Sequence, residues 1–131
     1  MIDAPSGPLH HASVLVVEDE IAIAVLLEDE LREAGYAIIG PASTVEEASG
    51  LVSSQRIDAA ILDIALTGRS VDTILAPLVA RGVPLVFMTG YGEGELPEWV
   101  PPVRRFAKPF HMPDLVACLP DLIQRSREGT G

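Results

Sequence analysis

The sequence predicts one α/β domain in which a parallel β-sheet is covered by helices on both faces. Short runs of Val, Ile and Leu alternate along the chain with longer helical patterns. These runs are apolar at nearly every position, as expected for strands that are buried on both faces. With 131 residues, 48% of them hydrophobic, the chain can bury a single core. We therefore expect a doubly wound five-stranded parallel sheet, with no second domain and no internal repeat.

Strands and helices are expected in regular alternation. The strand SVLVV precedes the helix IAIAVLLEDELREAGY, which Gly35 closes at a position suited to a left-handed cap. The strand YAIIGPA precedes the helix STVEEASGLVSSQ, where Ser43 and Glu46 form a capping-box pattern. The strand IDAAILDI precedes the helix SVDTILAPLVARG, which Pro77 should bend. The strands VPLVFMTG and VRRFAKP follow, and the helix MPDLVACLPDLIQRSR, interrupted at Pro120, ends the domain.

Both ends of the chain are predicted to be flexible. We assign residues 1–12 and 126–131 to tails and residues 13–125 to the folded domain. The opening MIDAPSGPLHHAS has no basic region ahead of an apolar one, and no apolar run reaches the ~18 residues that a membrane span needs. The single cysteine, Cys118, allows no internal disulfide. These features predict a cytoplasmic protein that does not bind membranes.

The charge of the chain limits its partners. Nine Lys and Arg against 19 Asp and Glu give a formal net charge of 9 − 19 = −10. Such a chain is repelled by nucleic acid and by anionic membranes, so neither is expected as a direct partner. A cation or the basic surface of another protein fits better, and we expect a monomer or a weak dimer.

Polar side chains interrupt the apolar runs where the strands end. They are three acids, one hydroxyl and one ammonium: Glu18, Asp19, Asp63, Thr89 and Lys108. Because the carboxyl ends of parallel strands share one edge of a sheet, these side chains should converge. Carboxylates suit Mg²⁺, which also takes up phosphate oxygens, while a hydroxyl and an ammonium suit the phosphate itself. Asp63 is left as the nucleophile, and the set predicts phosphoryl transfer.

Four segments, in this order, resemble the receiver domain of bacterial two-component response regulators: VLVVEDE, ILDI, FMTG and AKPF. The resemblance covers the chain from Ser13 to about Arg125. It implies the flavodoxin-like receiver fold, Mg²⁺ as cofactor, and a histidine kinase or histidine phosphotransfer protein as the phosphodonor. It also implies that the domain catalyses its own phosphorylation and dephosphorylation and turns over no external substrate.

The resemblance also assigns individual residues. It implies that Asp63 is the phosphoacceptor and that Glu18 and Asp19 hold Mg²⁺ together with it. It also implies that the backbone carbonyl of Ala65 completes the metal ligands and that the side chains of Thr89 and Lys108 contact the phosphoryl oxygens.

The chain departs from the common receiver pattern in two places. Three prolines in YGEGELPEWVPP predict a shortened or missing fourth helix. Arg105 occupies the position of the usual switch aromatic, and Tyr91 is either its replacement or an ordinary loop tyrosine. The segment FMTGYG is similar to single-domain receivers of bacterial general stress signalling with a Phe-Ala-Thr-Gly signature, although Met88 replaces Ala.

Two alternatives stay open. The strand-end acids could be ordinary caps, and the chain would then be a receiver-shaped interaction module that accepts no phosphate. A haloacid-dehalogenase-type phosphatase is not indicated, because Ala65 stands where that class needs a second Asp. On the first helix, Ile21 and Val25 form a second apolar stripe, which either docks a helical phosphodonor or belongs to one broad buried face.

Overall fold

The computed structural model describes residues 12–63, 72–89, 104–107 and 111–130. Its strands are β1 (Ser13–Val17), β2 (Ala37–Ala42), β3 (Ala59–Asp63), β4 (Leu85–Thr89) and β5 (Arg104–Ala107). Its helices are α2 (Ile21–Glu33), α3 (Val45–Ser54), α4 (Asp72–Ala80), α5 (Met112–Ala117) and α6 (Leu119–Thr130). These bounds confirm the predicted order of elements, and the last helical segment breaks beside Pro120 as expected.

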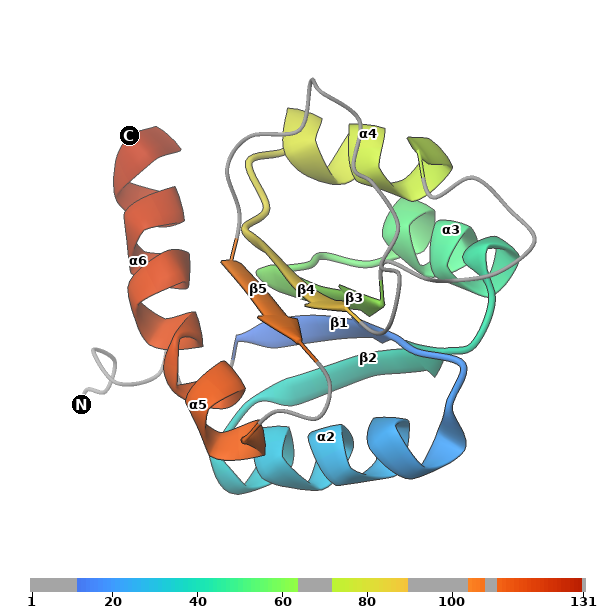
Figure 1. Cartoon of the computed structure of the whole chain (residues 1–131). Coiled ribbons are helices and arrows are strands. Elements are labelled where there is room, and N and C mark those ends of the chain that lie inside the picture. Colours follow the sequence, from blue (N-terminus) through green and yellow to red (C-terminus); the bar gives the residue numbers. More distant parts are fainter. Residues whose placement is uncertain (1–11, 64–71, 90–103, 108–110, 131) are drawn as a thin grey trace.

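The strands form one parallel five-stranded sheet in the order β2-β1-β3-β4-β5 (Figure 1). The order reverses at β1, whose neighbours are β2 on one side and β3 on the other. This is the doubly wound arrangement of the flavodoxin-like fold, and the fold prediction is confirmed. Parallel pairing brings the carboxyl ends of all the strands to one edge of the sheet.

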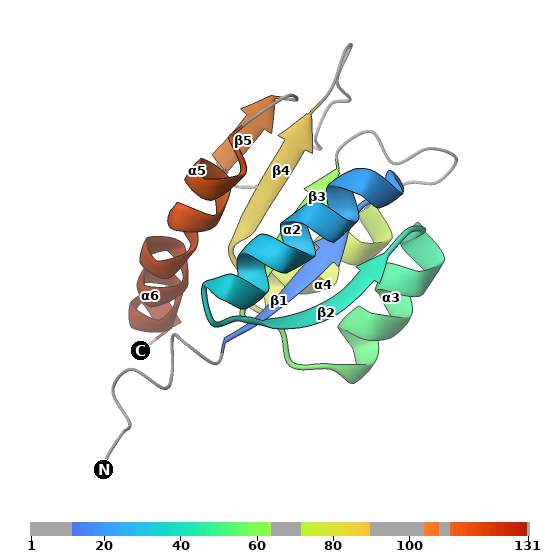
Figure 2. The same cartoon turned by 90° about the horizontal axis from the view of Figure 1, so that it is seen from below.

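Successive residues of the central strands face opposite sides of the sheet and enter two hydrophobic clusters. Leu15 and Val17 of β1 join residues of α3 and α4, whereas Val14 and Val16 join residues of α2, α5 and α6. Figure 2 shows α2 and α5 on one side of the sheet and α3 and α4 on the other. Because both faces are covered, the buried strands are apolar at every position, which is the pattern seen in the sequence.

The N-terminus of α3 is capped one residue later than predicted. Thr44 is the N-cap, and its hydroxyl accepts a hydrogen bond from the Glu47 N–H over 3.1 Å. The Glu47 carboxylate accepts from the Ser43 N–H over 2.7 Å and from the Ser43 hydroxyl over 3.0 Å. These bonds lower the pKa of Glu47. The predicted pairing of Ser43 with Glu46 is therefore wrong, and Glu47 has the reciprocal role.

The folded part extends beyond the predicted boundaries. Ala12 is buried, and its carbonyl accepts a hydrogen bond from the Ala37 N–H over 2.9 Å. Helix α6 continues to Thr130, whereas a flexible tail was expected from residue 126. Arg127 of this helix pairs with Asp58, 3.4 Å away next to the start of β3, which ties the helix to the sheet beyond residue 126. Among the described residues, no helix is both long and apolar enough to cross a membrane.

Two further predictions concern single features. Gly35 adopts a φ of 97° after α2, which confirms its left-handed capping role. The predicted weakness of the fourth helix concerns residues 90–103, which lie outside the described part of the chain.

At the break between α5 and α6, burial raises the pKa of the Cys118 thiol.

Candidate metal and phosphoacceptor site

Three carboxylates meet at the carboxyl ends of β1 and β3. Val17 of β1 pairs with Leu62 of β3. The residues that follow this pair, Glu18 and Asp63, therefore lie side by side. One ligand oxygen from each of Glu18, Asp19 and Asp63 lies within 4.8 Å of the others. Glu18 is only 2% exposed and Asp63 only 5%, whereas Asp19 is exposed. The predicted convergence of these three residues is confirmed.

The turn after β1 fixes Glu18 in this position. Its N–H donates to the Ala42 carbonyl at the end of β2 over 2.9 Å, and its carboxylate accepts from the Glu20 N–H over 2.9 Å. The Glu20 carbonyl in turn accepts from the Ala24 N–H over 3.0 Å, which begins α2. The backbone therefore turns from strand to helix within three residues and leaves Asp19 at the rim of the cluster.

The composition of the cluster fits a hard divalent cation. Three like charges this close repel one another, and burial of two of them removes much of the screening by water. Mg²⁺ prefers carboxylate oxygens, usually takes only a few of them, and keeps positions for water and phosphate. Glu18, Asp19 and Asp63 are therefore suited to hold Mg²⁺, as the sequence predicts.

The other predicted site residues are placed in part. Thr89 is the last residue of β4, in register with Ala107 of β5, so its backbone lies at the same edge of the sheet as Asp63. Arg105 lies in β5 and is exposed. Three further predicted positions lie outside the described residues: Ala65, Tyr91 and Lys108.

The start of α2 carries an apolar surface next to the acidic cluster. Ile21 is 79% exposed, Val25 49% and Leu26 57%. Leu27 and Leu31, on the opposite face of the helix, are fully buried. Ile21 and Val25 thus form an exposed stripe, and the alternative of one broad buried face is wrong. The sequence pattern did not identify Leu26, because in the letters it is indistinguishable from its buried neighbour Leu27.

Comparisons with known proteins agree with this geometry. The family described as "Response regulator receiver domain" matches residues 14–119. The transcriptional regulatory protein PdtaR of Mycobacterium tuberculosis (strain ATCC 25618 / H37Rv) is 32% identical over 121 residues, which are 89% of this chain and 59% of PdtaR. The phyllosphere-induced regulator PhyR of Methylorubrum extorquens is 35% identical over 113 residues, 81% of this chain and 41% of PhyR. The chain thus spans only part of the length of these relatives.

Solved structures show the same similarity. SdrG from Sphingomonas melonis Fr1 has 34% identity and a TM-score of 0.73, with 88% of this chain and 98% of SdrG covered. The receiver domain of the sensor histidine kinase PA1611 from Pseudomonas aeruginosa PAO1, solved with a magnesium ion in its active site cleft, has 25% identity and a TM-score of 0.73, with 87% and 98% covered. With the fold, the acidic cluster and these matches in agreement, the chain belongs to the response regulator receiver domain family of two-component signalling proteins.

Proposed function

We propose that this domain accepts a phosphoryl group on Asp63 from a histidine kinase or a histidine phosphotransfer protein in the cytoplasm, and that it signals through protein contacts. The observation that supports this most is the acidic cluster, in which oxygens of Glu18, Asp19 and Asp63 lie within 4.8 Å of one another at the carboxyl edge of the sheet. Two buried acids beside a third form a set of hard oxygen ligands suited to a divalent cation, so the arrangement favours a functional role over a structural one.

In the proposed step, an oxygen of the Asp63 carboxylate forms a bond to the phosphorus of a phosphohistidine. The bond between phosphorus and the histidine nitrogen breaks, and the nitrogen takes the electron pair and a proton from solvent. The phosphoryl group then remains on Asp63 as an acyl phosphate. Asp63 is only 5% exposed, so the donor must approach along the sheet edge where the strands end.

Each remaining residue of the site has a defined task. Glu18 and Asp19, with Asp63, would hold Mg²⁺, which when bound neutralises negative charge on phosphoryl oxygens. Following the family resemblance, the Ala65 carbonyl would complete the protein's metal ligands, and Thr89 and Lys108 would contact the phosphoryl oxygens. The domain would thereby catalyse its own phosphorylation and dephosphorylation without turning over an external substrate.

The direct test is intact mass spectrometry after incubation with acetyl phosphate and Mg²⁺. We expect the wild-type chain to gain one phosphoryl group, and we expect no gain for Asp63→Ala or when EDTA replaces Mg²⁺. Asp58→Ala is a suitable control, because Asp58 lies at the other end of β3 and should not be needed. If the folded wild-type chain gains nothing, the proposal fails and the chain acts as an interaction module of receiver shape.

The exposed stripe on α2 suggests where the protein phosphodonor docks. The exposed stripe of Ile21, Val25 and Leu26 starts two residues after Asp19, so a helical donor seated on it would bring its histidine to the acidic cluster. Contact with an apolar donor helix would also remove these side chains from water. We therefore assign this stripe to the phosphodonor rather than to an output partner.

Val25→Glu tests this docking surface. The protein donor is a phosphorylated histidine phosphotransfer domain that labels the wild-type chain. We expect Val25→Glu to slow transfer from this donor by about tenfold or more, with labelling by acetyl phosphate unchanged. Ala34→Glu is the matched control, since it adds the same charge at the exposed far end of α2, about 14 Å away along the helix axis. Equal rates for wild type and Val25→Glu with the protein donor would show that the donor binds elsewhere.

A further inference from the structure

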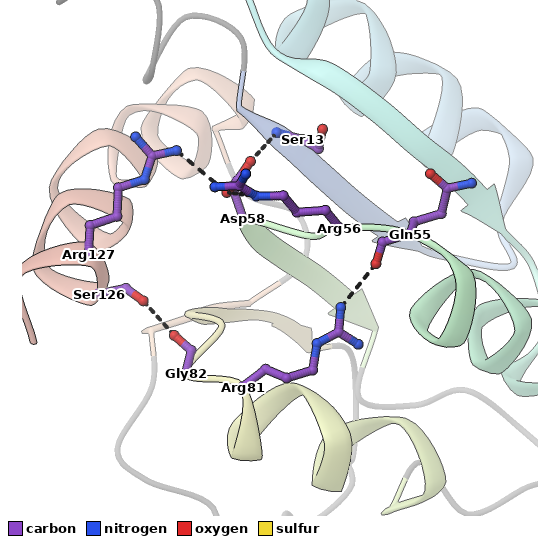
Figure 3. A network of polar contacts seen from close by, with 8 residues as sticks. All are labelled: Ser13, Gln55, Arg56, Asp58, Arg81, Gly82, Ser126 and Arg127. Carbon is purple, nitrogen blue, oxygen red and sulfur yellow. Dashed lines mark hydrogen bonds and ion pairs between the residues drawn. The ribbon is translucent and has the colours of Figure 1, made fainter. Parts of the chain in front are cut away.

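A basic cavity lies at the end of the sheet opposite the acidic cluster. It has a volume of about 260 Å³ and lies where α3 and α4 end, beside the start of β3 and the middle of α6. Arginines from three separate places in the chain line it: Arg56 after α3, Arg81 after α4, and Arg127 on α6. Figure 3 shows Arg56 and Arg127 next to Asp58, which precedes β3, and Arg81 next to Gln55.

Asp58 is the only acid that lines the cavity among the described residues. One of its oxygens accepts from the Ser13 N–H over 2.8 Å, while the other lies 3.4 Å from Arg127 and 3.7 Å from the Nε atom of Arg56. The Asp58 side chain is 13% exposed, and these contacts tie β1, β3 and α6 together. This structural role needs only one positive charge to balance the carboxylate.

Arg81 is held by the end of a helix rather than by an acid. Its guanidinium donates to the Val52 carbonyl over 2.7 Å and to the Gln55 carbonyl over 3.0 Å, both at the C-terminus of α3. A helix C-terminus carries about half a negative charge, so these bonds balance only part of the Arg81 charge. They also use two of its five N–H groups, which leaves donors for another acceptor.

Positive charge therefore predominates around the cavity. Three guanidinium groups face one carboxylate and one helix end, in a chain with only nine Lys and Arg in total. Arg56 contributes most to this excess, because its side chain is 85% exposed and its ion pair with Asp58 spans 3.7 Å, too long for a hydrogen bond. The outer edge of its guanidinium is free to meet a ligand.

Part of the cavity wall is apolar. Ile57, Val83 and Ile123 supply this part and come from the β3, β4 and α6 regions of the chain. Small-molecule sites combine apolar lining with a few converging polar groups. Guanidinium groups bind phosphate and carboxylate oxygens in pairs of parallel hydrogen bonds.

We propose that this cavity binds a small organic oxyanion, whose phosphate or carboxylate group contacts Arg56, Arg81 and Arg127 and whose apolar part packs on Ile57, Val83 and Ile123. The site is separate from the phosphoacceptor, because β3 runs for about 16 Å from Asp58 to Asp63 in the acidic cluster. The two sites can therefore be tested independently.

The test is an amide NMR titration of the full chain with phenylphosphonate, which cannot transfer its phosphorus group, in Mg²⁺-free buffer at constant ionic strength. We expect saturable shifts at the amides of residues 56–59 and 81–83. Arg56→Gln should weaken binding about tenfold, since it removes an ionic donor from an exposed position without opening a buried pair. Methylphosphonate should bind more weakly than phenylphosphonate, because it has no group to cover the apolar wall.

Arg125→Gln is the matched control. Arg125 also lies on α6, pairs with Asp121 over 3.0 Å and is 74% exposed, but does not line the cavity. Equal weakening by both variants would show a response to net charge alone and would overturn the proposal, as would shifts that do not saturate or that appear only at the acidic cluster. A parallel titration with benzoate assigns the preferred group, phosphate or carboxylate, if either ligand binds as expected.

Discussion

The charge arrangement at the two ends of β3 predicts opposite effects for the same chemical change. Asp63→Asn removes one of three clustered carboxylates, whereas Asp58→Asn removes the partner of Arg127 and Arg56. Both variants lower the net negative charge of the chain by one unit. Any difference between them therefore reports the local surroundings and not the overall charge.

The magnitude follows from the distances. Two unit charges 4.8 Å apart repel by about 0.9 kcal/mol in water and by about 3.5 kcal/mol at an effective dielectric constant of about 20. Since Asp63 is buried beside buried Glu18 and exposed Asp19, we expect Asp63→Asn to stabilise the metal-free protein by about 1–3 kcal/mol. We expect Asp58→Asn to destabilise it by about 1–3 kcal/mol, because it weakens a hydrogen bond and an ion pair at a mostly buried carboxylate.

Urea unfolding in EDTA at pH 7 measures both values. Repeating it with Mg²⁺ at about 100 times its dissociation constant should stabilise the wild-type chain by about 2.7 kcal/mol. It should stabilise Asp63→Asn much less, because that variant lacks one charged ligand. Repulsion within the acidic cluster is refuted as the cause if Asp63→Asn is destabilised as much as Asp58→Asn in EDTA, and Asp63 is refuted as a metal ligand if Mg²⁺ stabilises Asp63→Asn as strongly as wild type.

Two further predictions concern α3 and the strand before it. The first concerns glycine substitutions. Gly50→Ala should raise the free energy of unfolding by about 0.5–1 kcal/mol, because an added Cβ in the helix meets nothing within 4 Å. Gly40→Ala should lower it by more than about 1 kcal/mol, because an alanine is strained at a φ of 97° and its Cβ would lie 2.6 Å and 3.0 Å from backbone atoms. Urea midpoints measure both, and a loss of stability in Gly50→Ala would contradict the first. The second concerns Glu47. Glu47→Gln should lower the free energy of unfolding at pH 7, and the difference from wild type should vanish as the pH falls through the lowered pKa of Glu47. The reason is that a carboxylate with a depressed folded-state pKa stabilises the protein only while it is ionised. A difference that persists at acid pH would contradict this explanation.

Much of the fold and part of the site could be predicted from local patterns. Apolar runs buried on both faces identify parallel strands, and parallel strands place their carboxyl ends together. Glu18 and Asp63 are distant in the sequence, yet they meet because each follows or ends such a strand. The exposure of Val25 also follows from helical periodicity, once Leu27 and Leu31 define the buried face.

The features that could not be predicted depend on choices between equal patterns or on long-range contacts. Ser43 and Thr44 both have a glutamate three residues later, and only the start of α3 decides that Thr44 is the N-cap. The extension of α6 depends on Arg127, whose partner lies at the start of β3.

The basic cavity had no signal in the sequence. Its arginines follow or belong to three different helices, and nothing in the local sequence around each one indicates that they converge. Only the packing of α3, α4 and α6 around the amino end of the sheet brings them together.

We propose that Asp63 itself carries the phosphoryl group. It is tested most directly by locating the modification: the acetyl phosphate-treated chain is trapped with hydroxylamine, which converts an acyl phosphate to a hydroxamate, and the peptides are sequenced by mass spectrometry. We predict that the hydroxamate appears at Asp63, requires Mg²⁺ during phosphorylation, and is absent from Asp58. A hydroxamate at another carboxylate, or none in a folded chain, would contradict the account.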